Sequence, residues 1–164
     1  RQRFNKLDSL FIEYVDIDYI SRFVVGRYWR TMPEAQQKQF QEVFNRYALA
    51  MYKTLPLEFA SNLSYNVTGV SEDNGFTEIT ARVNFALSPD KPAQSVNVRF
   101  RLHQVGDKIK LVDIKLEESS LILAYRTRFA EMIEGVDGEI EWFIEDLTDL
   151  AVSAERNVQT KIRG

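Results

Sequence analysis

The chain has 164 residues, of which 45% are hydrophobic and 27% charged, and its formal net charge is −3. This length fits a single domain over residues 1–164 that buries its own core. The basic residues are scattered, which argues against a nucleic-acid partner, because nucleic-acid-binding domains usually carry a basic stripe. The absence of cysteine excludes disulfide bonds, thiolate metal sites and cysteine nucleophiles.

Hydrophobic residues recur at helical spacing through the first third of the chain. The first predicted helix runs from about Arg3 to Tyr14, and Asp16 can cap a second helix that ends at Gly26. Thr31-Met32-Pro33-Glu34 has the pattern of a capping box and opens a long third helix, which Pro56 ends. The inner face of that helix consists of Phe40, Val43, Phe44, Tyr47, Met51, Tyr52 and Leu55.

The pattern then changes to the alternation that is typical of β-strands. Strands are expected at about residues 63–67, 79–87, 96–102 and 109–116, with tight turns at Asn74-Gly75 and Gly106-Asp107. Four consecutive strands joined by short connections predict an antiparallel meander with one hydrophobic face.

Helical spacing returns after the fourth strand. A helix capped by Ser119 or Ser120 is expected to run to an interruption at Gly135 and Asp137-Gly138. A last long helix, from about residue 138, is expected to pack on the rest of the domain. Helices before and after an antiparallel meander predict the α+β fold class.

Catalytic signatures are missing from the sequence, which has no nucleophile elbow, no H-E-x-x-H motif and no phosphate-binding loop. The single histidine, His103, is expected in an ordinary role near a strand end. Glu117, Glu118 and the acidic residues of the last helix fit a solvated surface better than a metal site, since oxygen cages usually need a loop with convergent carbonyls. We therefore expect no enzymatic activity, no metal and no cofactor.

Aromatic residues are numerous, with 11 phenylalanines and 7 tyrosines, mostly at positions that face inward. They can fill a solid core. Alternatively, a curved sheet and helices can enclose a cavity of the kind that binds apolar ligands. Periodicity does not separate these two interpretations, because a cavity wall and a core face carry the same pattern.

Three blocks of the sequence resemble the motifs of one family. The segment from Val15 to Arg30 is similar to "D-x-x-x-I-x-R-x-V-L-G-x-Y-W-R", and the long helix is similar to "F-x-x-x-F-x-x-x-L-x-x-x-Y-x-x-x-L" from Phe40 onward. The region from Asp113 to Phe129 is similar to "D-V-x-x-x-G-x-S-L-x-x-N-Y-R-x-x-F". The three blocks, and their order along the chain, resemble the motifs of the periplasmic phospholipid-binding MlaC family, also called the toluene-tolerance family.

The resemblance extends from Phe4 to about Leu147, with departures that suggest a divergent member. The family usually has Trp, Gly and Asn where this chain has Ile109, Glu118 and Ala124. Loss of that glycine suggests a different turn into the late helix. Loss of the tryptophan changes one wall or one packing layer.

The resemblance implies a cone-like α+β fold in which helices wrap a curved sheet around an apolar cavity. It also implies a monomeric periplasmic carrier, with phospholipid as its ligand, that serves the lipid asymmetry of the outer membrane. Such a carrier would shuttle lipid between an outer-membrane lipoprotein complex and an inner-membrane ABC transporter complex with a lipid-shuttling domain.

We expect the cavity wall to combine inward residues from both helices and strands. These residues are Phe44, Tyr47, Val83, Phe85, Val98, Phe100, Val112, Ile114, Tyr125 and Phe129. Arg126 is a candidate contact for the lipid phosphate near the cavity mouth, against the alternative of a structural or surface arginine. Trp29 is expected to seal the junction of the second and third helices.

Two other functions remain open. The departures from the family pattern keep open a carrier for a hopanoid or a sterol-like lipid. A cone-shaped fold can also host an isomerase or a dehydratase, which needs a buried general base and a second polar group. The inward strand positions offer no such pair, so we disfavour the enzyme.

Overall fold

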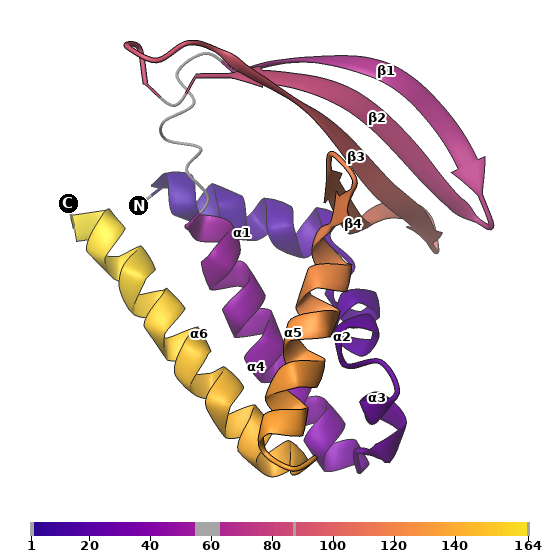
Figure 1. Ribbon diagram of the computed structural model, residues 1–164, viewed down its shortest axis with the longest axis vertical. Coiled ribbons are helices and arrows are strands. Elements are labelled where there is room, and N and C mark those ends of the chain that lie inside the picture. The colour runs from indigo at the N-terminus through magenta and orange to yellow at the C-terminus, as the bar shows by residue number, and fades with distance from the viewer. Residues whose placement is uncertain (1, 55–62, 87, 164) are drawn as a thin grey trace.

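The computed structural model describes residues 2–54, 63–86 and 88–163, so the predicted inward positions Leu55 and Leu87 lie outside the described residues. Helices come first, then strands, then helices again (Figure 1), which confirms the α+β class. The elements are α1 (Gln2–Tyr14), α2 (Ile17–Val25), α3 (Tyr28–Thr31), α4 (Glu34–Lys53), β1 (Ser64–Asp73), β2 (Phe76–Phe85), β3 (Gln94–Val105), β4 (Lys108–Leu116), β5 (Ser119–Ser120), α5 (Leu121–Gly135) and α6 (Ile140–Arg163).

Helix α2 begins and ends as the sequence predicts. The Asp16 side chain accepts a hydrogen bond from the backbone N–H of Tyr19, and Gly26 ends the helix with φ +54°. The predicted capping box is wrong. The Thr31 hydroxyl donates back to the carbonyl of Tyr28, because Thr31 is the last residue of α3. Helix α4 begins at Glu34, and its N-cap residue Pro33 makes no side-chain hydrogen bond.

The strands form one antiparallel sheet in the order β1-β2-β3-β4-β5, which confirms the predicted meander and adds a two-residue fifth strand. Asn74 and Gly75 join β1 to β2 with φ +50° and +85°. Positive φ at both central residues is what the tightest hairpin turn requires, and asparagine followed by glycine supplies it. The sheet is curved and arches over the helices without closing on itself (Figure 1).

The two faces of the sheet differ in chemistry. One face carries hydrophobic rows that cross the strands, and we call it the hydrophobic face. Its rows are Tyr65–Val83–Val96, Val67–Ala81–Val98–Leu116 and Val70–Ile79–Phe100–Ile114. The opposite face is polar, with rows such as Asn66–Arg82–Asn97 and Glu78–Arg101–Asp113. Because successive strand residues point to opposite faces, the alternation in the sequence predicts this division.

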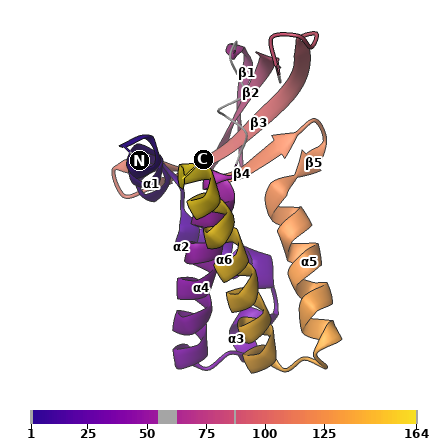
Figure 2. The same cartoon turned by 90° about the vertical axis from the view of Figure 1, so that its left-hand side faces the viewer.

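The helices pack mainly on one another. Helices α4 and α6 lie side by side and run towards the sheet, whereas α5 runs away from it (Figures 1 and 2). An ion pair of 2.7 Å between Arg46 and Glu155 also joins α4 to α6. We call the buried cluster that these helices share with α2 the helical core. It consists of Val24, Val25, Met32, Phe40, Val43, Phe44, Tyr47, Ile122, Phe129, Ile133, Ile140, Phe143, Ile144, Leu147 and Ala151.

The helical core and the hydrophobic face do not merge into one core. Among the described residues, neither the members of the helical core nor the hydrophobic residues packed against it lie on a strand. The sheet meets α1, α2 and α5 chiefly through β4 and β5, and every residue of β1 is exposed. The domain therefore has a solid helical half and a sheet whose hydrophobic face is partly bare.

Candidate functional site

The ten residues predicted to line a cavity fall into two groups in the structure. The helical group lies inside the helical core, where Phe44, Tyr47 and Phe129 are 2%, 3% and 0% exposed. Their rings touch: the centroids of Phe44 and Phe129 are 5.9 Å apart, and those of Tyr47 and Tyr125 are 6.1 Å apart. The aromatic side chains of this group fill space between helices. Their predicted contact with a ligand stays a prediction.

The strand group lies on the sheet. Val83, Val98, Phe100 and Ile114 belong to the rows of the hydrophobic face, and Val98 is 7% exposed. Phe85 pairs with Gln94 at the far end of β2 and points to the same side as Val83. Val112 is completely buried in β4. The structure thus brings most of the predicted strand positions together on one surface, apart from the helical group.

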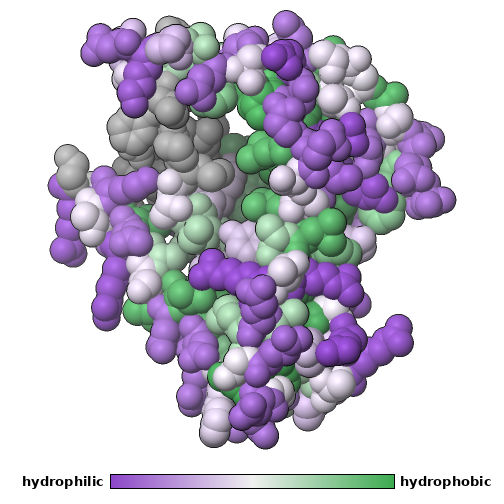
Figure 3. All heavy atoms as spheres, viewed as in Figure 1, coloured by the Kyte–Doolittle hydropathy of each residue, from purple (hydrophilic) through white to green (hydrophobic). Residues whose placement is uncertain are grey.

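Strand β1 adds hydrophobic residues that the predicted wall left out. Tyr65, Val67 and Val70 lie on the hydrophobic face with 68%, 57% and 67% of their surfaces exposed. The alternation in this segment was the signal that could have included them. Figure 3 shows a hollow beneath the sheet with hydrophobic atoms along part of its wall. Contiguous exposed hydrophobic surface of this kind marks an interaction site, because its exposure to water is unfavourable in free energy.

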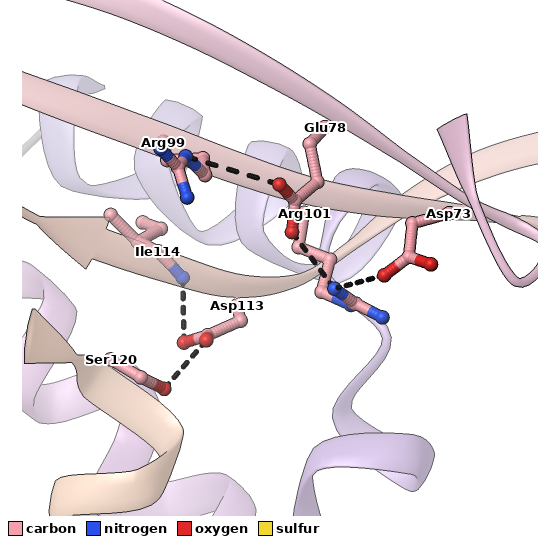
Figure 4. A network of polar contacts seen from close by, with 7 residues as sticks. All are labelled: Asp73, Glu78, Arg99, Arg101, Asp113, Ile114 and Ser120. Atoms are coloured by element: carbon pink, nitrogen blue, oxygen red, sulfur yellow. Dashed lines mark hydrogen bonds and ion pairs between the residues drawn. The ribbon is translucent and has the colours of Figure 1, made fainter. Parts of the chain in front are cut away.

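Asp113 fixes the junction between the sheet and α5. This buried carboxylate accepts hydrogen bonds from the Ser120 hydroxyl and from the backbone N–H of Ile114 (Figure 4). It also accepts one from the backbone N–H of Ile122. On the same polar face, Glu78 Oε1 lies 2.8 Å from Nη1 of Arg101 (Figure 4). The Glu78–Arg101 pair joins β2 to β3 within the sheet. The contacts of Asp113 tie β4 to β5 and to the start of α5.

A second candidate site is a pocket of about 590 Å³ that joins the first and last family-like blocks of the sequence. We call it the arginine pocket. Its lining residues are Asp16, Asp18, Tyr19, Arg22, Phe23, Gly26, Trp29, Arg30, Val105 and Arg126. Arg126, the candidate phosphate contact, therefore lies between α5 and α2. No residue of the arginine pocket belongs to the hydrophobic rows of the sheet.

Aromatic rings support two of the three arginines of this pocket. The guanidinium carbon of Arg22 lies 5.3 Å from the centroid of the Trp29 ring, and that of Arg126 lies 4.9 Å from the centroid of Phe23. Arg126 also covers Gly26, where an added Cβ would lie 2.8 Å from Nη2 of Arg126. Trp29 is partly buried and packs against the helical core, in agreement with its expected sealing position.

His103 joins the sheet to the start of α2. Its Nε2 atom lies 2.6 Å from Oδ2 of Asp16, and its ring stacks on Phe76, with the Tyr19 ring against its edge. Asp16 is therefore both a helix cap and the partner of a strand histidine. The sequence indicated the first role but not the second, because the two residues are far apart along the chain.

The departures from the family pattern lie at exposed positions. Ile109 in β4, Glu118 in the turn after β4 and Ala124 on α5 are all exposed. At that turn the positive φ falls on Glu117, at +54°, and its carboxylate accepts a hydrogen bond from the backbone N–H of Asn97. A side-chain contact thus supports the turn where the family has a glycine.

Two kinds of feature are not found among the described residues. Within them, no three histidine or acidic side chains gather closely enough to hold a metal ion. None of the helices described there combines the length and hydropathy of a membrane-spanning segment.

Comparison with known proteins is informative at the level of family and fold. A solved structure of a phospholipid-binding protein from Ralstonia solanacearum, in complex with a phospholipid, matches with a TM-score of 0.74 at 18% identity. The match covers 93% of this chain and 84% of that one, and at this identity it shows a common fold. No protein of curated function matches the chain. The family model described as "MlaC protein" matches residues 1–149, so the chain belongs to the MlaC family.

Proposed function

We propose that the protein is a lipid carrier that binds phospholipid acyl chains against the hydrophobic face of its sheet and performs no chemistry. The observation that carries this proposal is the separation of two hydrophobic surfaces. The helices bury most of their apolar side chains in a core of their own, while Tyr65, Val67 and Val70 leave the hydrophobic face partly bare. A sheet in a folded domain normally covers such a face.

Acyl chains are a suitable cover for this surface. Transferring hydrocarbon out of water gains about 0.8 kcal/mol per methylene, or roughly 13 kcal/mol for a 16-carbon chain. The hydrophobic face offers aliphatic and aromatic side chains along four strands, with Val98 and Phe100 near its centre. These side chains and those of Val83, Phe85 and Ile114 are the proposed lipid contacts. The aromatic residues of the helical core would form the rigid floor beneath them.

The comparisons support the ligand class. The chain belongs to the MlaC family, and a protein of the same fold from Ralstonia solanacearum binds a phospholipid. We further propose that the carrier works as a monomer in the periplasm. There it would move phospholipid between an outer-membrane lipoprotein complex and an inner-membrane ABC transporter complex, and so maintain the lipid asymmetry of the outer membrane. Family membership supports this wider role, which needs no cofactor beyond the bound lipid.

The proposal is tested by placing a charge on either face of β1. Tyr65→Glu and Val67→Glu put a carboxylate on the hydrophobic face at exposed positions, so the fold is expected to tolerate both changes. Asn66→Glu is the matched control, because Asn66 is also exposed but pairs with Arg82 on the polar face. The measurements are native mass spectrometry of bound lipid and transfer of phospholipid from donor to acceptor vesicles.

We expect Tyr65→Glu and Val67→Glu to lower the amount of bound lipid and the rate of its transfer at least tenfold. Each substitution would bury a charge against an acyl chain. Asn66→Glu should carry lipid at the wild-type level. Wild-type transfer by all three variants would show that lipid does not use the hydrophobic face.

A further inference from the structure

The arginine pocket contains positive charge that the protein itself leaves unmatched. Arg22, Arg30 and Arg126 line it, and none of the three forms an ion pair with a described residue. Elsewhere on the molecule, Arg46 and Arg101 pair with glutamates at 2.7 and 2.8 Å, whereas Arg156 forms no ion pair with a described residue. What distinguishes the pocket is that three unpaired arginines line it together.

The acids of the pocket do not neutralise these arginines. Two aspartates face three arginines in the lining. Asp16 is already engaged, since its carboxylate accepts from the N–H of Tyr19 and lies 2.6 Å from His103. Asp18 forms no ion pair with any described residue. The pocket therefore keeps a positive balance and free N–H donors.

The aromatic rings hold the guanidinium groups without consuming their hydrogen-bonding capacity. Arg22 lies over the Trp29 ring and Arg126 over the Phe23 ring, contacts that occupy none of the guanidinium N–H groups with a hydrogen bond. A guanidinium has five N–H donors around its edge, and these remain available to a ligand. The guanidinium of Arg126 lies close to Gly26, where only a residue without a Cβ leaves room for it.

We infer that the arginine pocket is a second binding site and that it takes a phosphate group. One bidentate arginine satisfies a carboxylate, which has two oxygens in one plane. Three arginines around one pocket match an anion with more acceptor oxygens. The volume of about 590 Å³ lies in the range of small-molecule sites and leaves room for an esterified phosphate. The phosphate can belong to a lipid headgroup or to a free phosphate ester.

The first test uses soluble phosphates and does not depend on acyl-chain binding. Isothermal titration calorimetry would measure the binding of inorganic phosphate and of glycerol 3-phosphate at constant ionic strength, with chloride as the reference anion.

Tryptophan fluorescence gives a second signal for the same binding. Trp142→Phe leaves Trp29 as the only tryptophan, because the chain has two. Trp142 is 56% exposed on α6 and does not line the pocket, so emission from Trp29 then reports on the pocket.

Removal of one arginine charge should weaken phosphate binding only when that arginine lines the pocket. We expect Arg22→Gln and Arg126→Gln each to raise the Kd about tenfold, as loss of a charge-assisted hydrogen bond does. The control is Arg156→Gln, which makes the same charge change at an exposed position of α6 outside the pocket and should stay within about twofold. Melting temperatures establish that all three variants remain folded.

The second test separates the two sources of phosphate. Vesicles of phosphatidylcholine, with and without phosphatidylglycerol, would be tested for flotation of the protein with and without competing glycerol 3-phosphate. Flotation that requires phosphatidylglycerol and is lost in Arg126→Gln supports the inference with a lipid headgroup as the source. Binding of the soluble phosphates without flotation supports it with a free ester as the source.

Three results would overturn the inference. One is that the protein binds neither the soluble phosphates nor the vesicles when phosphate or lipid headgroup is present at millimolar concentration. Another is that Arg156→Gln weakens binding as much as Arg22→Gln does. The third is that a glutamate-rich peptide binds the pocket more tightly than glycerol 3-phosphate, which would assign the site to an acidic protein segment. Failure of the acyl-chain site would leave the result with soluble phosphate unchanged, so the two proposals can fail separately.

Discussion

The hydroxyl of Ser120 donates a 2.6 Å hydrogen bond to Oδ2 of Asp113 at the point where the sheet passes into α5. Both residues are buried, at 8% and 5% exposed, and Oδ1 of Asp113 accepts from two backbone N–H groups. One carboxylate thus holds β4, β5 and the first turn of α5 together. Together with the contact of His103 with Asp16 at the start of α2, this junction helps to set where the hydrophobic face lies.

Asp113→Ala is expected to lower the free energy of unfolding by roughly 2–4 kcal/mol, because it leaves a buried hydroxyl and two N–H groups without an acceptor. Urea denaturation would measure the change. Ser95→Ala is the control, since Ser95 donates to Asn84 in an exposed hydrogen bond and its loss should cost at most about 0.5 kcal/mol. Equal losses in the two variants would contradict a special role for Asp113.

Gly26→Ala is expected to destabilise the protein by about 1–3 kcal/mol, since φ +54° strains an L-residue. Part of the cost should come from Arg126, because the new Cβ would lie 2.8 Å from Nη2 of that side chain. The substitution should therefore cost less in an Arg126→Ala background, with a coupling energy of about 0.5 kcal/mol or more in a double-mutant cycle. Gly69→Ala, where a Cβ meets nothing within 4 Å, is the control. A strictly additive cycle would show that Arg126 does not rest on Gly26 in solution.

Phe129→Ala should cost roughly 3–5 kcal/mol of unfolding free energy, because the fully buried ring contacts aromatic neighbours on α4 and α6. Leu123→Ala, at a position of the same helix that is 53% exposed, should change stability by at most about 0.5 kcal/mol. Chemical denaturation of both variants without lipid would check this. A small loss for Phe129→Ala would indicate that its ring borders an empty cavity.

Burial raises the pKa of the Tyr125 phenol above its ordinary value, and the neighbouring Tyr47 adds to the rise. The folded state thus favours the neutral phenol. Its contribution to stability is complete below the unfolded pKa of about 10 and is lost as the pH rises through the folded pKa. Thermal melts across the alkaline range should show a steeper fall above about pH 10 for the wild type than for Tyr125→Phe. Parallel curves would mean that the phenol is not buried in solution.

Local pattern determined most of the fold. The hydrophobic spacing along α4, the Asp16 cap and the Asn74-Gly75 turn predicted their elements correctly, because each depends on residues that are neighbours along the chain. The capping box at Thr31 failed for a related reason. The short helix α3 ends there, and the hydroxyl of Thr31 takes the nearer carbonyl of Tyr28.

The sequence by itself determined the α+β class, the meander and which face of each element is hydrophobic. The spacing of hydrophobic residues shows this directly, because it repeats every 3.6 residues in a helix and every 2 residues in a strand. Only the tertiary structure decided what covers each face. It placed Phe44 and Phe129 in a packed helical core and left Val67 of β1 exposed, although each of the three lies on the hydrophobic face of its own element. It also brought Arg22 and Arg126 into one pocket. Periodicity describes the chemistry of a surface, whereas its partner depends on how distant segments pack, and that is set by the energy of the whole domain.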